Sequence, residues 1–134
     1  MTTITIFHNV AEDEAGRHLG MLDGYEPMFH TLVPVARYER SERAVQSGIN
    51  LLEEAFEIFN VGDIGGNPIA REYRGRENRS LSVGDVVSIT TRTGTQYFAC
   101  ARTGWEEVPA PLLIDATRAV YGTTGIYAPA AVTS

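Results

Sequence analysis

The sequence predicts an α+β domain in which one main helix packs on a small, mostly antiparallel β-sheet. Two observations lead to this prediction: an amphipathic helical pattern over Ser41–Asn60, and several short stretches in which apolar and polar residues alternate. A chain of 134 residues is long enough to bury a single core. We expect residues 1–122 to form that one domain. Residues 123–134 are small and weakly patterned, so we expect a loosely ordered C-terminal tail.

The predicted helix has a start signal, an apolar face and a stop signal. Ser41 is suited to the N-cap, and Glu42 would lie in the first turn, where the helix dipole favours an acid. Asn60 and Gly62 provide the stop. The apolar residues between them recur at spacings of four and three, which places them on one face of a helix. They are Val45, Ile49, Leu52, Phe56 and Phe59.

Four strands are predicted from alternation and from turn residues. Pro34 cannot donate to a sheet ladder, so its strand should lie at an edge or contain a bulge there. Gly94 can adopt the positive φ of a short hairpin loop between the last two strands. The segment Gly104–Val108 then reads as a short third strand or edge after that hairpin. The four predicted strands are Ile4–Phe7, Leu32–Tyr38, Val86–Thr91 and Thr95–Ala101.

Composition limits the functional classes. The net charge of −6 disfavours non-specific attraction to nucleic acid or to an anionic membrane. Cys100 is the only cysteine, so no internal disulfide can form, and a reducing compartment is favoured. No apolar run approaches the roughly 20 residues that a membrane helix needs. The N-terminus lacks the pattern of a secretion signal. We therefore expect a cytoplasmic protein with no membrane association, and the sequence leaves its oligomeric state open.

The segment Val61–Arg79 combines glycines with a cluster of arginines. Its composition predicts a long exposed loop, and long loops in small domains are usually functional or disordered. Ordering it costs backbone entropy that its few apolar side chains cannot offset, so a partner would order it more easily than its own domain. The arginines suit phosphate or carboxylate recognition, or they pair with nearby acids. They are Arg71, Arg74, Arg76 and Arg79.

Two further features are candidates for binding. An acidic helix face could mimic phosphates, although a solvated helix surface explains it equally well. It consists of Glu53, Glu54 and Glu57. Trp105, near the start of a strand, would serve either as a stacking platform or as the lid of the core.

Residues with catalytic potential have simpler structural interpretations. Asp85 follows a glycine before an apolar strand, where it would accept local backbone N–H groups. Cys100 lies in an apolar strand, where a buried thiol is the expected interpretation, although a Cys–His nucleophile stays open. The histidines His8, His18 and His30 show no short-spaced metal-binding pair. We therefore predict no catalytic residue, no metal and no cofactor.

Part of the chain resembles a known family, the YodL-like domain. The residues that carry the resemblance are Leu51–Asn60, a Ser-Leu-Ser-Val-Gly-Asp-Val-Val run at Ser80–Val87, Tyr97 and Gly104–Val108. The resemblance covers roughly residues 33–108, and Trp105 stands where the family more often has phenylalanine. The family is carried by bacterial plasmids, conjugative elements and phages. The resemblance implies a mobile-element accessory protein with a role in overcoming host defences. The family has no enzymatic activity that the resemblance would assign to this chain.

The leading functional hypothesis is therefore a non-enzymatic intracellular accessory protein of a phage or plasmid. It would act by binding another macromolecule, most readily a protein, and could inhibit a host defence system. The first alternative is a nucleic-acid-binding module that uses the Arg71–Arg79 loop and Trp105. The second is a small hydrolase or nucleotide-binding protein that uses Asp85 and a histidine.

Overall fold

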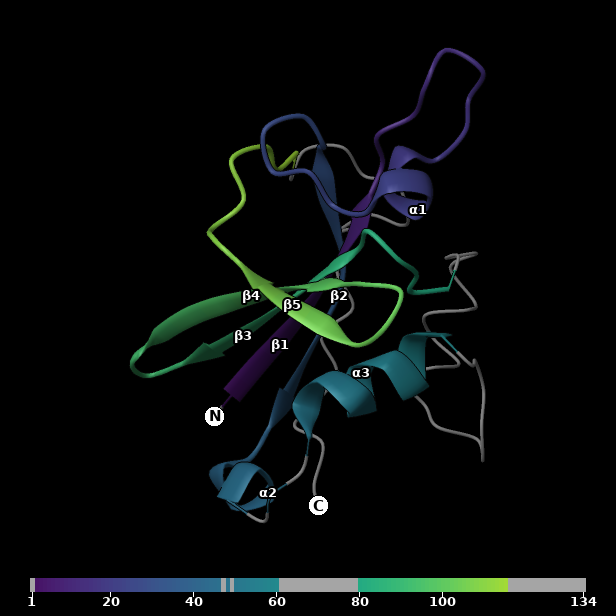
Figure 1. Ribbon diagram of the computed structural model, residues 1–134. Helices are drawn as coiled ribbons and strands as arrows, with labels where there is room; N and C mark the ends of the chain where they lie inside the picture. Colours follow the sequence, from purple (N-terminus) through teal and green to yellow (C-terminus); the bar gives the residue numbers. More distant parts are fainter. Residues whose placement is uncertain (1, 47, 49, 61–79, 116–134) are drawn as a thin grey trace.

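The protein is built around one five-stranded antiparallel sheet with the strand order β2-β1-β3-β4-β5 (Figure 1). The computed structural model describes residues 2–46, 48, 50–60 and 80–115. The strands are β1 (Thr2–Asn9), β2 (Leu32–Arg40), β3 (Val86–Thr91), β4 (Gly94–Cys100) and β5 (Trp105–Val108). The helices are short, and they are α1 (Leu19–Asp23), α2 (Glu42–Gln46) and α3 (Leu51–Asn60).

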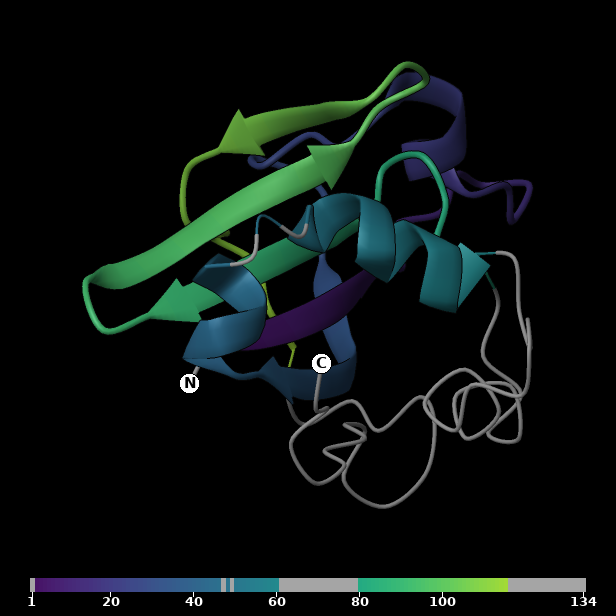
Figure 2. The same ribbon diagram turned by 90° about the horizontal axis from the view of Figure 1, so that it is seen from below.

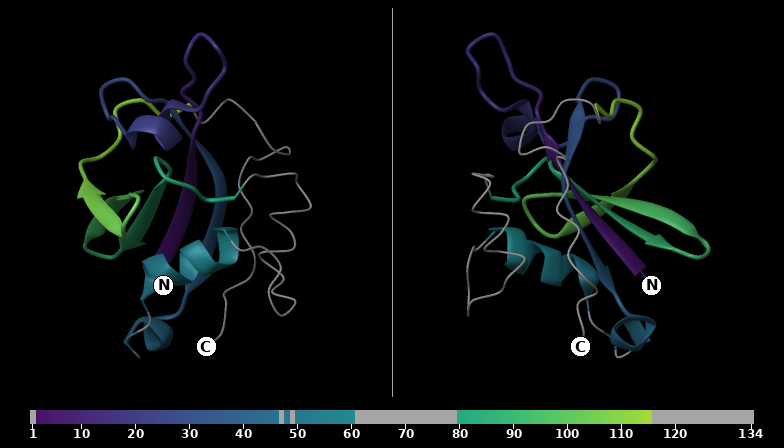
Figure 3. Two further views of the ribbon diagram at one scale, coloured as in Figure 1. Left: turned by 45° about the vertical axis from the view of Figure 1, so that its right-hand side comes forward. Right: turned by 180° about the vertical axis from the view of Figure 1, so that it is seen from behind.

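The predicted fold class is wrong. The described chain is mainly an antiparallel sheet with short helices, and no main helix spans Ser41–Asn60. That region forms α2 and α3 instead, and α2 lies at the opposite end of the sheet from α1 (Figure 3).

A glycine and a second N-cap explain why the helix is divided. Gly48 adopts a φ of 89°, which no α-helix accommodates. Asn50 then starts α3, because its Oδ1 accepts the N–H of Glu53 at 3.1 Å and its carbonyl accepts the N–H of Glu54 at 3.0 Å. The apolar spacing continues across this break, so the pattern indicated one helix where the backbone forms two.

The four predicted strands are present, and β5 adds a fifth. The first strand, β1, lies inside the sheet, with β2 on one side and β3 on the other. The expectation for Pro34 is confirmed, because β2 is an edge strand and the β1–β2 register shifts between Ile6 and Phe7, where Phe7 pairs with Pro34. The hairpin at Gly94 joins β3 and β4, as its turn residues predict.

Helix α3 covers one face of the sheet (Figure 2). Phe59 is fully buried, and its ring lies 5.9 Å from that of Tyr38 on β2. Phe56 meets Trp105 on β5 edge to face, with ring centroids 6.4 Å apart. Because β2 and β5 are the two edges of the sheet, one short helix contacts both. Burial of each large side chain contributes about 1.5–3 kcal/mol.

The opposite face of the sheet has a second, smaller apolar cluster. Its buried members come from four positions on the strands, namely Phe7, Leu32, Val86 and Ala99. Tyr25, from the segment between α1 and β2, packs on this cluster, as do Tyr97 and Val108. The sheet therefore has apolar side chains packed on both of its faces.

A buried polar junction joins α1 to the start of β3. The Asn9 side chain donates to the carbonyl of Gly84 at 3.1 Å, and the backbone N–H of Asn9 donates to Asp85 at 2.8 Å. Gly20 and Gly84 lie so close that a Cβ on Gly84 would meet the Gly20 backbone at 2.5 Å. A Cβ on Gly20 would in turn meet the amide of Asn9 at 2.7 Å. Only glycine fits at either position.

Several predictions concern residues outside the described ranges. The predicted loop 61–79 and the predicted tail 123–134 both lie there, as does the proposed domain limit at residue 122. Within the part of the chain that the structure describes, no helix is long and apolar enough to cross a membrane.

Replacing Gly84 with alanine should destabilise the protein far more than the same change at Gly24. Both glycines have positive φ, 92° and 81°, so both changes incur backbone strain of about 1–3 kcal/mol. Only Gly84 has another backbone where the Cβ would go, whereas Gly24 has nothing within 4 Å. Gly84→Ala should therefore cost several kcal/mol more, or prevent folding, in urea unfolding experiments. Equal losses would contradict the close approach of Gly20 and Gly84.

Candidate binding site

A hollow of about 140 Å³ lies between α3 and the turn that joins β4 to β5. Helix α3 supplies two of its lining residues, and the β4–β5 turn with the adjoining strand ends supplies the others. Figure 2 shows α3 alongside this hairpin. The residues that line the hollow are Glu53, Phe56, Cys100, Ala101, Arg102, Gly104 and Trp105.

Aromatic rings form the walls of the hollow. Trp105 and Phe56 are both half-buried, and they meet nearly perpendicular at 86°. Cys100 is the most buried of the lining residues. Trp105 thus acts both as a lid on the core and as a wall of the hollow, so the two interpretations of its role are compatible.

Charged residues stand at the rim. Glu53 from α3 and Arg102 from the β4–β5 turn are exposed and line the hollow. Further along β5, Glu106 and Glu107 are also exposed. An apolar hollow with rim charges of both signs can hold one apolar side chain and orient the charged groups beside it.

The acidic helix face is only partly as predicted. Glu53 and Glu57 are exposed on α3, but Glu54 points to β2. Its carboxylate accepts the Tyr38 hydroxyl at 3.2 Å, and it pairs with Arg40 at 3.4 Å. The placement of Glu54 on a solvated face is therefore wrong. Successive residues on a helix are about 100° apart, which turns Glu54 away from Glu53.

The structure brings together two of the predicted binding residues, Glu53 and Trp105. Glu57 lies one turn beyond the hollow. The predicted arginines Arg71, Arg74, Arg76 and Arg79 lie outside the described residues. Phe56 and Arg102 also line the hollow, and neither was predicted as a site residue. Phe56 was read only as core, and the one signal for Arg102 was the Gly104 turn directly before Trp105.

Asp85 has a structural role. It is fully buried, and its two carboxylate oxygens accept backbone N–H groups from Asn9 and Ser82, each at 2.8 Å. Such bonds hold the turn before β3 and align it with the end of β1. This geometry agrees with the turn interpretation and leaves no carboxylate oxygen facing the hollow.

Cys100 is poorly suited to nucleophilic chemistry. Burial and the neighbouring Asp85 raise the pKa of its thiol to about 11. A reactive cysteine needs the opposite shift, because the thiolate is the nucleophile. Its backbone also serves the sheet, since the Cys100 N–H donates to the Asp85 carbonyl at 2.8 Å.

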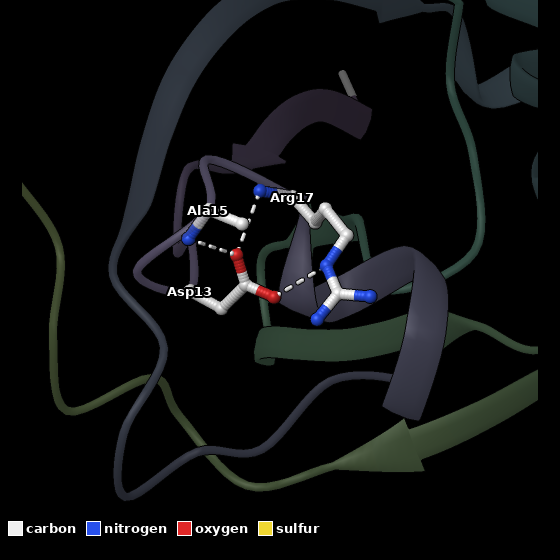
Figure 4. A network of polar contacts seen from close by, with 3 residues as sticks. All are labelled: Asp13, Ala15 and Arg17. Atoms are coloured by element: carbon white, nitrogen blue, oxygen red, sulfur yellow. Dashed lines mark hydrogen bonds and ion pairs between the residues drawn. The ribbon is translucent and has the colours of Figure 1, made fainter.

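Two titratable residues near the N-terminus, Asp13 and His30, are engaged in local structure. Asp13 accepts the N–H groups of Ala15 and Arg17, each at 2.9 Å, and pairs with the Arg17 side chain at 2.7 Å (Figure 4). The backbone N–H of Arg17, with its side chain and the N–H groups of Ala15 and Gly16, lowers the pKa of Asp13. His30 is buried and its Nδ1 accepts the N–H of Glu26 at 3.1 Å. The described residues contain no group of three side chains that could hold a metal.

Comparison of the chain with protein-family models, with curated proteins and with solved structures finds no match.

The pairing of Tyr38 with Glu54 should make stability depend on pH in the alkaline range. Burial and the Glu54 carboxylate raise the pKa of Tyr38 well above its usual range. The contribution of neutral Tyr38 is therefore complete below about pH 10, where an unfolded tyrosine titrates, and declines as the pH rises toward the folded pKa. Tyr38→Phe should cost about 1 kcal/mol at neutral pH through loss of the hydrogen bond. Above about pH 10 its unfolding free energy should fall less steeply than that of the wild type. Parallel pH profiles of the two proteins would contradict the shift.

Cys100 should react slowly with thiol reagents in the folded protein. Because its pKa is about 11 instead of 9, its thiolate fraction near pH 8 is lower by roughly 100-fold. A more basic thiolate is also more nucleophilic, which offsets part of this difference. Reaction with a disulfide reagent should therefore be at least about tenfold slower than in urea-unfolded protein, and its rate should keep rising beyond about pH 9. Equal rates in the folded and unfolded protein would show that the thiol is accessible and ionised.

Proposed function

We propose that this chain is a non-enzymatic binding protein that engages a protein partner through the hollow between α3 and the β4–β5 turn. The observation that supports the proposal is the combination, at one place, of an aromatic wall and rim charges. Trp105 and Phe56 provide apolar surface for the partner, and the charges of Glu53 and Arg102 orient the partner on it. Tryptophan and arginine are the residues most enriched where interfaces gain their affinity.

The size of the hollow favours one anchoring side chain over a small-molecule ligand. Sites for drug-sized molecules and cofactors usually enclose about 300–1,000 Å³. At about 140 Å³, this hollow is smaller than that range and open to neighbouring surface at its rim. A partner that inserts one apolar side chain would gain the remaining contacts from the surface around it.

The charge around Trp105 favours a protein partner over nucleic acid. On the face of the sheet that holds Trp105, the carboxylates of Glu53 and Glu107 outnumber the guanidinium of Arg102. The whole chain also carries a net charge of −6. Nucleic acids are bound mainly through their phosphates, which such a surface repels. A stacking role for Trp105 on bases would have to overcome this repulsion.

The resemblance to the YodL-like domain adds a biological setting to the proposal, that of a mobile-element accessory protein that acts on a host defence protein. In the structure, the residues behind the resemblance contact one another. The Leu81 N–H donates to the Phe59 carbonyl at 2.9 Å, and the Ser80 hydroxyl donates to the Asn60 carbonyl at 2.9 Å. The Asn60 side chain returns a hydrogen bond to Leu81 at 2.6 Å. These residues join α3 to the strand that follows, so they account for a fold signature more directly than for a site.

Glu53→Lys should reduce capture of the partner, whereas Glu57→Lys should not. Both residues are exposed on α3 and both changes reverse one charge, but only Glu53 lines the hollow. The affinity-tagged protein is incubated with bacterial lysate treated with nuclease, and the bound proteins are identified by mass spectrometry. We expect a protein that binds to wild type and Glu57→Lys, with at least a tenfold loss for Glu53→Lys.

The helix-dipole cost of the Glu53 change is about 0.3–1 kcal/mol, so both variants should fold, which circular dichroism can check. If no bound protein distinguishes Glu53→Lys from Glu57→Lys, the hollow is not the binding site. Capture that disappears with nuclease treatment would favour the nucleic-acid alternative.

A further inference from the structure

The outer edge of β5 exposes backbone hydrogen-bonding groups beside the hollow. On β4, Cys100 directs its own backbone groups toward β3: its N–H donates to Asp85 at 2.8 Å and its carbonyl accepts the N–H of Gly84 at 2.9 Å. The Cys100–Trp105 pair of the β4–β5 ladder is therefore not hydrogen-bonded. Consistent with this, the next pair is bonded, because the Ala101 N–H donates to the Gly104 carbonyl at 3.0 Å.

The alternation of an antiparallel ladder then fixes which groups of β5 face outward. Hydrogen-bonded and non-bonded pairs alternate along such a ladder, so Glu106 and Val108 bond to β4. Trp105 and Glu107 direct their N–H and C=O groups away from the sheet. No hydrogen bond within the described ranges engages these outward groups of Trp105 or Glu107.

Side-chain direction places this edge and the hollow on the same face. Successive residues of a strand point to opposite faces. Trp105 packs on the core under α3, whereas Val108 packs on the cluster of the opposite face. Glu107 therefore shares the α3 face with Trp105. A strand added along β5 would direct every second side chain to the face that holds the hollow.

The other edge of the sheet is less open at the corresponding end. On β2, the outward groups of Leu32 are already used: its N–H donates to Leu113 and its carbonyl accepts the N–H of Asp115, each at 2.9 Å. The next outward position is Pro34, which has no N–H. Of the two edges, β5 therefore combines outward donors and acceptors with an adjacent hollow.

We propose that the outer edge of β5 binds an extended, basic segment of a partner protein. This segment adds a sixth strand to the sheet and inserts one apolar side chain into the hollow. The inference rests on the proposed function and specifies how the partner binds. Backbone pairing with Trp105 and Glu107 supplies register, and the hollow supplies side-chain selectivity, as in other cases of strand addition.

The negative charge of β5 favours a basic segment over a second copy of this chain as the strand that pairs with it. Glu106 and Glu107 are consecutive and exposed on β5, so they attract lysine or arginine on a neighbouring strand. If β5 paired with β5 of another copy, these acids would approach one another, and like charges across a strand pair are destabilising. The same acids would protect the edge from self-association.

The test uses peptide libraries with defined alternation. One library contains eight-residue, tryptophan-free peptides in which lysine or arginine alternates with apolar residues, and the second replaces every basic residue with glutamate. Trp105 is the only tryptophan, so its fluorescence reports binding at the hollow directly. We expect binders in the basic library and at least tenfold weaker binding by their acidic counterparts. Absence of binders in the basic library, or equal binding by the two libraries, would overturn the proposal.

N-methylation of the peptide tests strand pairing itself. For the best basic peptide, one version is N-methylated at odd positions and another at even positions. Only one set of N–H groups can face β5, so one version should lose at least tenfold in affinity while the other binds nearly as well as the parent. If both versions bind equally, or both lose binding to the same extent, strand addition is wrong.

Variants of the protein provide the complementary test. Glu106 points to the face opposite the hollow, which is where the basic side chains of the peptide lie when its apolar residues face the hollow. Glu106→Lys should therefore weaken the basic peptide at least tenfold and strengthen its acidic counterpart, whereas Glu14→Lys, an exposed change in the segment before α1, should do neither. Glu107→Pro removes an outward N–H that β4 does not use, so it should abolish peptide binding and retain the fold. Glu106→Pro removes an N–H that β4 does use, so it should destabilise the sheet.

These results separate the inference from the proposed function. If Glu53→Lys abolishes capture of the lysate protein but Glu106→Lys and N-methylation have no effect, the hollow binds a partner without strand addition. If the basic peptides bind at the edge but Glu53→Lys leaves capture unchanged, the hollow is not the natural site. A dimer in sedimentation experiments that Glu107→Pro dissociates would show that a second copy occupies the edge and would overturn the inference.

Discussion

The close approach of Gly20 to Gly84 around the side chain of Asn9 is the constraint on which the rest of the structure depends. Asn9 ends β1, and it bonds at once to Gly84, to His30 and to the N–H of Ala11. These bonds bring the segment before β3 against α1 and hold β1 and β3 in register. The site is also directly connected to this junction, because Gly84 and Asp85 bond to the backbone of Cys100, which pairs with Trp105.

Helix α3 contacts both edge strands of the sheet. Its contacts with Tyr38 on one edge strand and with Trp105 on the other depend on a helix held at both ends, by Asn50 at the start and by bonds from Asn60 to Leu81 at the finish. The hollow lies where Glu53 and Phe56 of α3 face the β4–β5 turn. Its shape is therefore a property of the helix–sheet contact and not of any single loop.

Local chemistry in the sequence predicted the strands well and the helix poorly. Alternation and Pro34 located four strands and an edge, since both depend on neighbours along the chain. Helical periodicity continued through Gly48, so it concealed the break between α2 and α3. Glu53 and Trp105 were recognised as candidates from residue type, but their meeting is a tertiary event that no spacing encodes. The inward turn of Glu54 was missed because its partner, Tyr38, comes from a distant strand.

The position of β1 has a consequence for how the chain folds as it is synthesised. The N-terminal strand lies inside the sheet, and its register pairs Ile6 with Val87 as well as with Ala36. A nascent chain can form the β1–β2 hairpin early. The other side of β1 cannot form its hydrogen bonds until β3 has left the ribosome. Pairings between such distant segments must first overcome the entropy of closing a long loop, which slows folding. During that interval the unpaired side of β1 is the segment most exposed to wrong partners, so a chaperone that shields extended strands would have most effect before residue 90 has emerged.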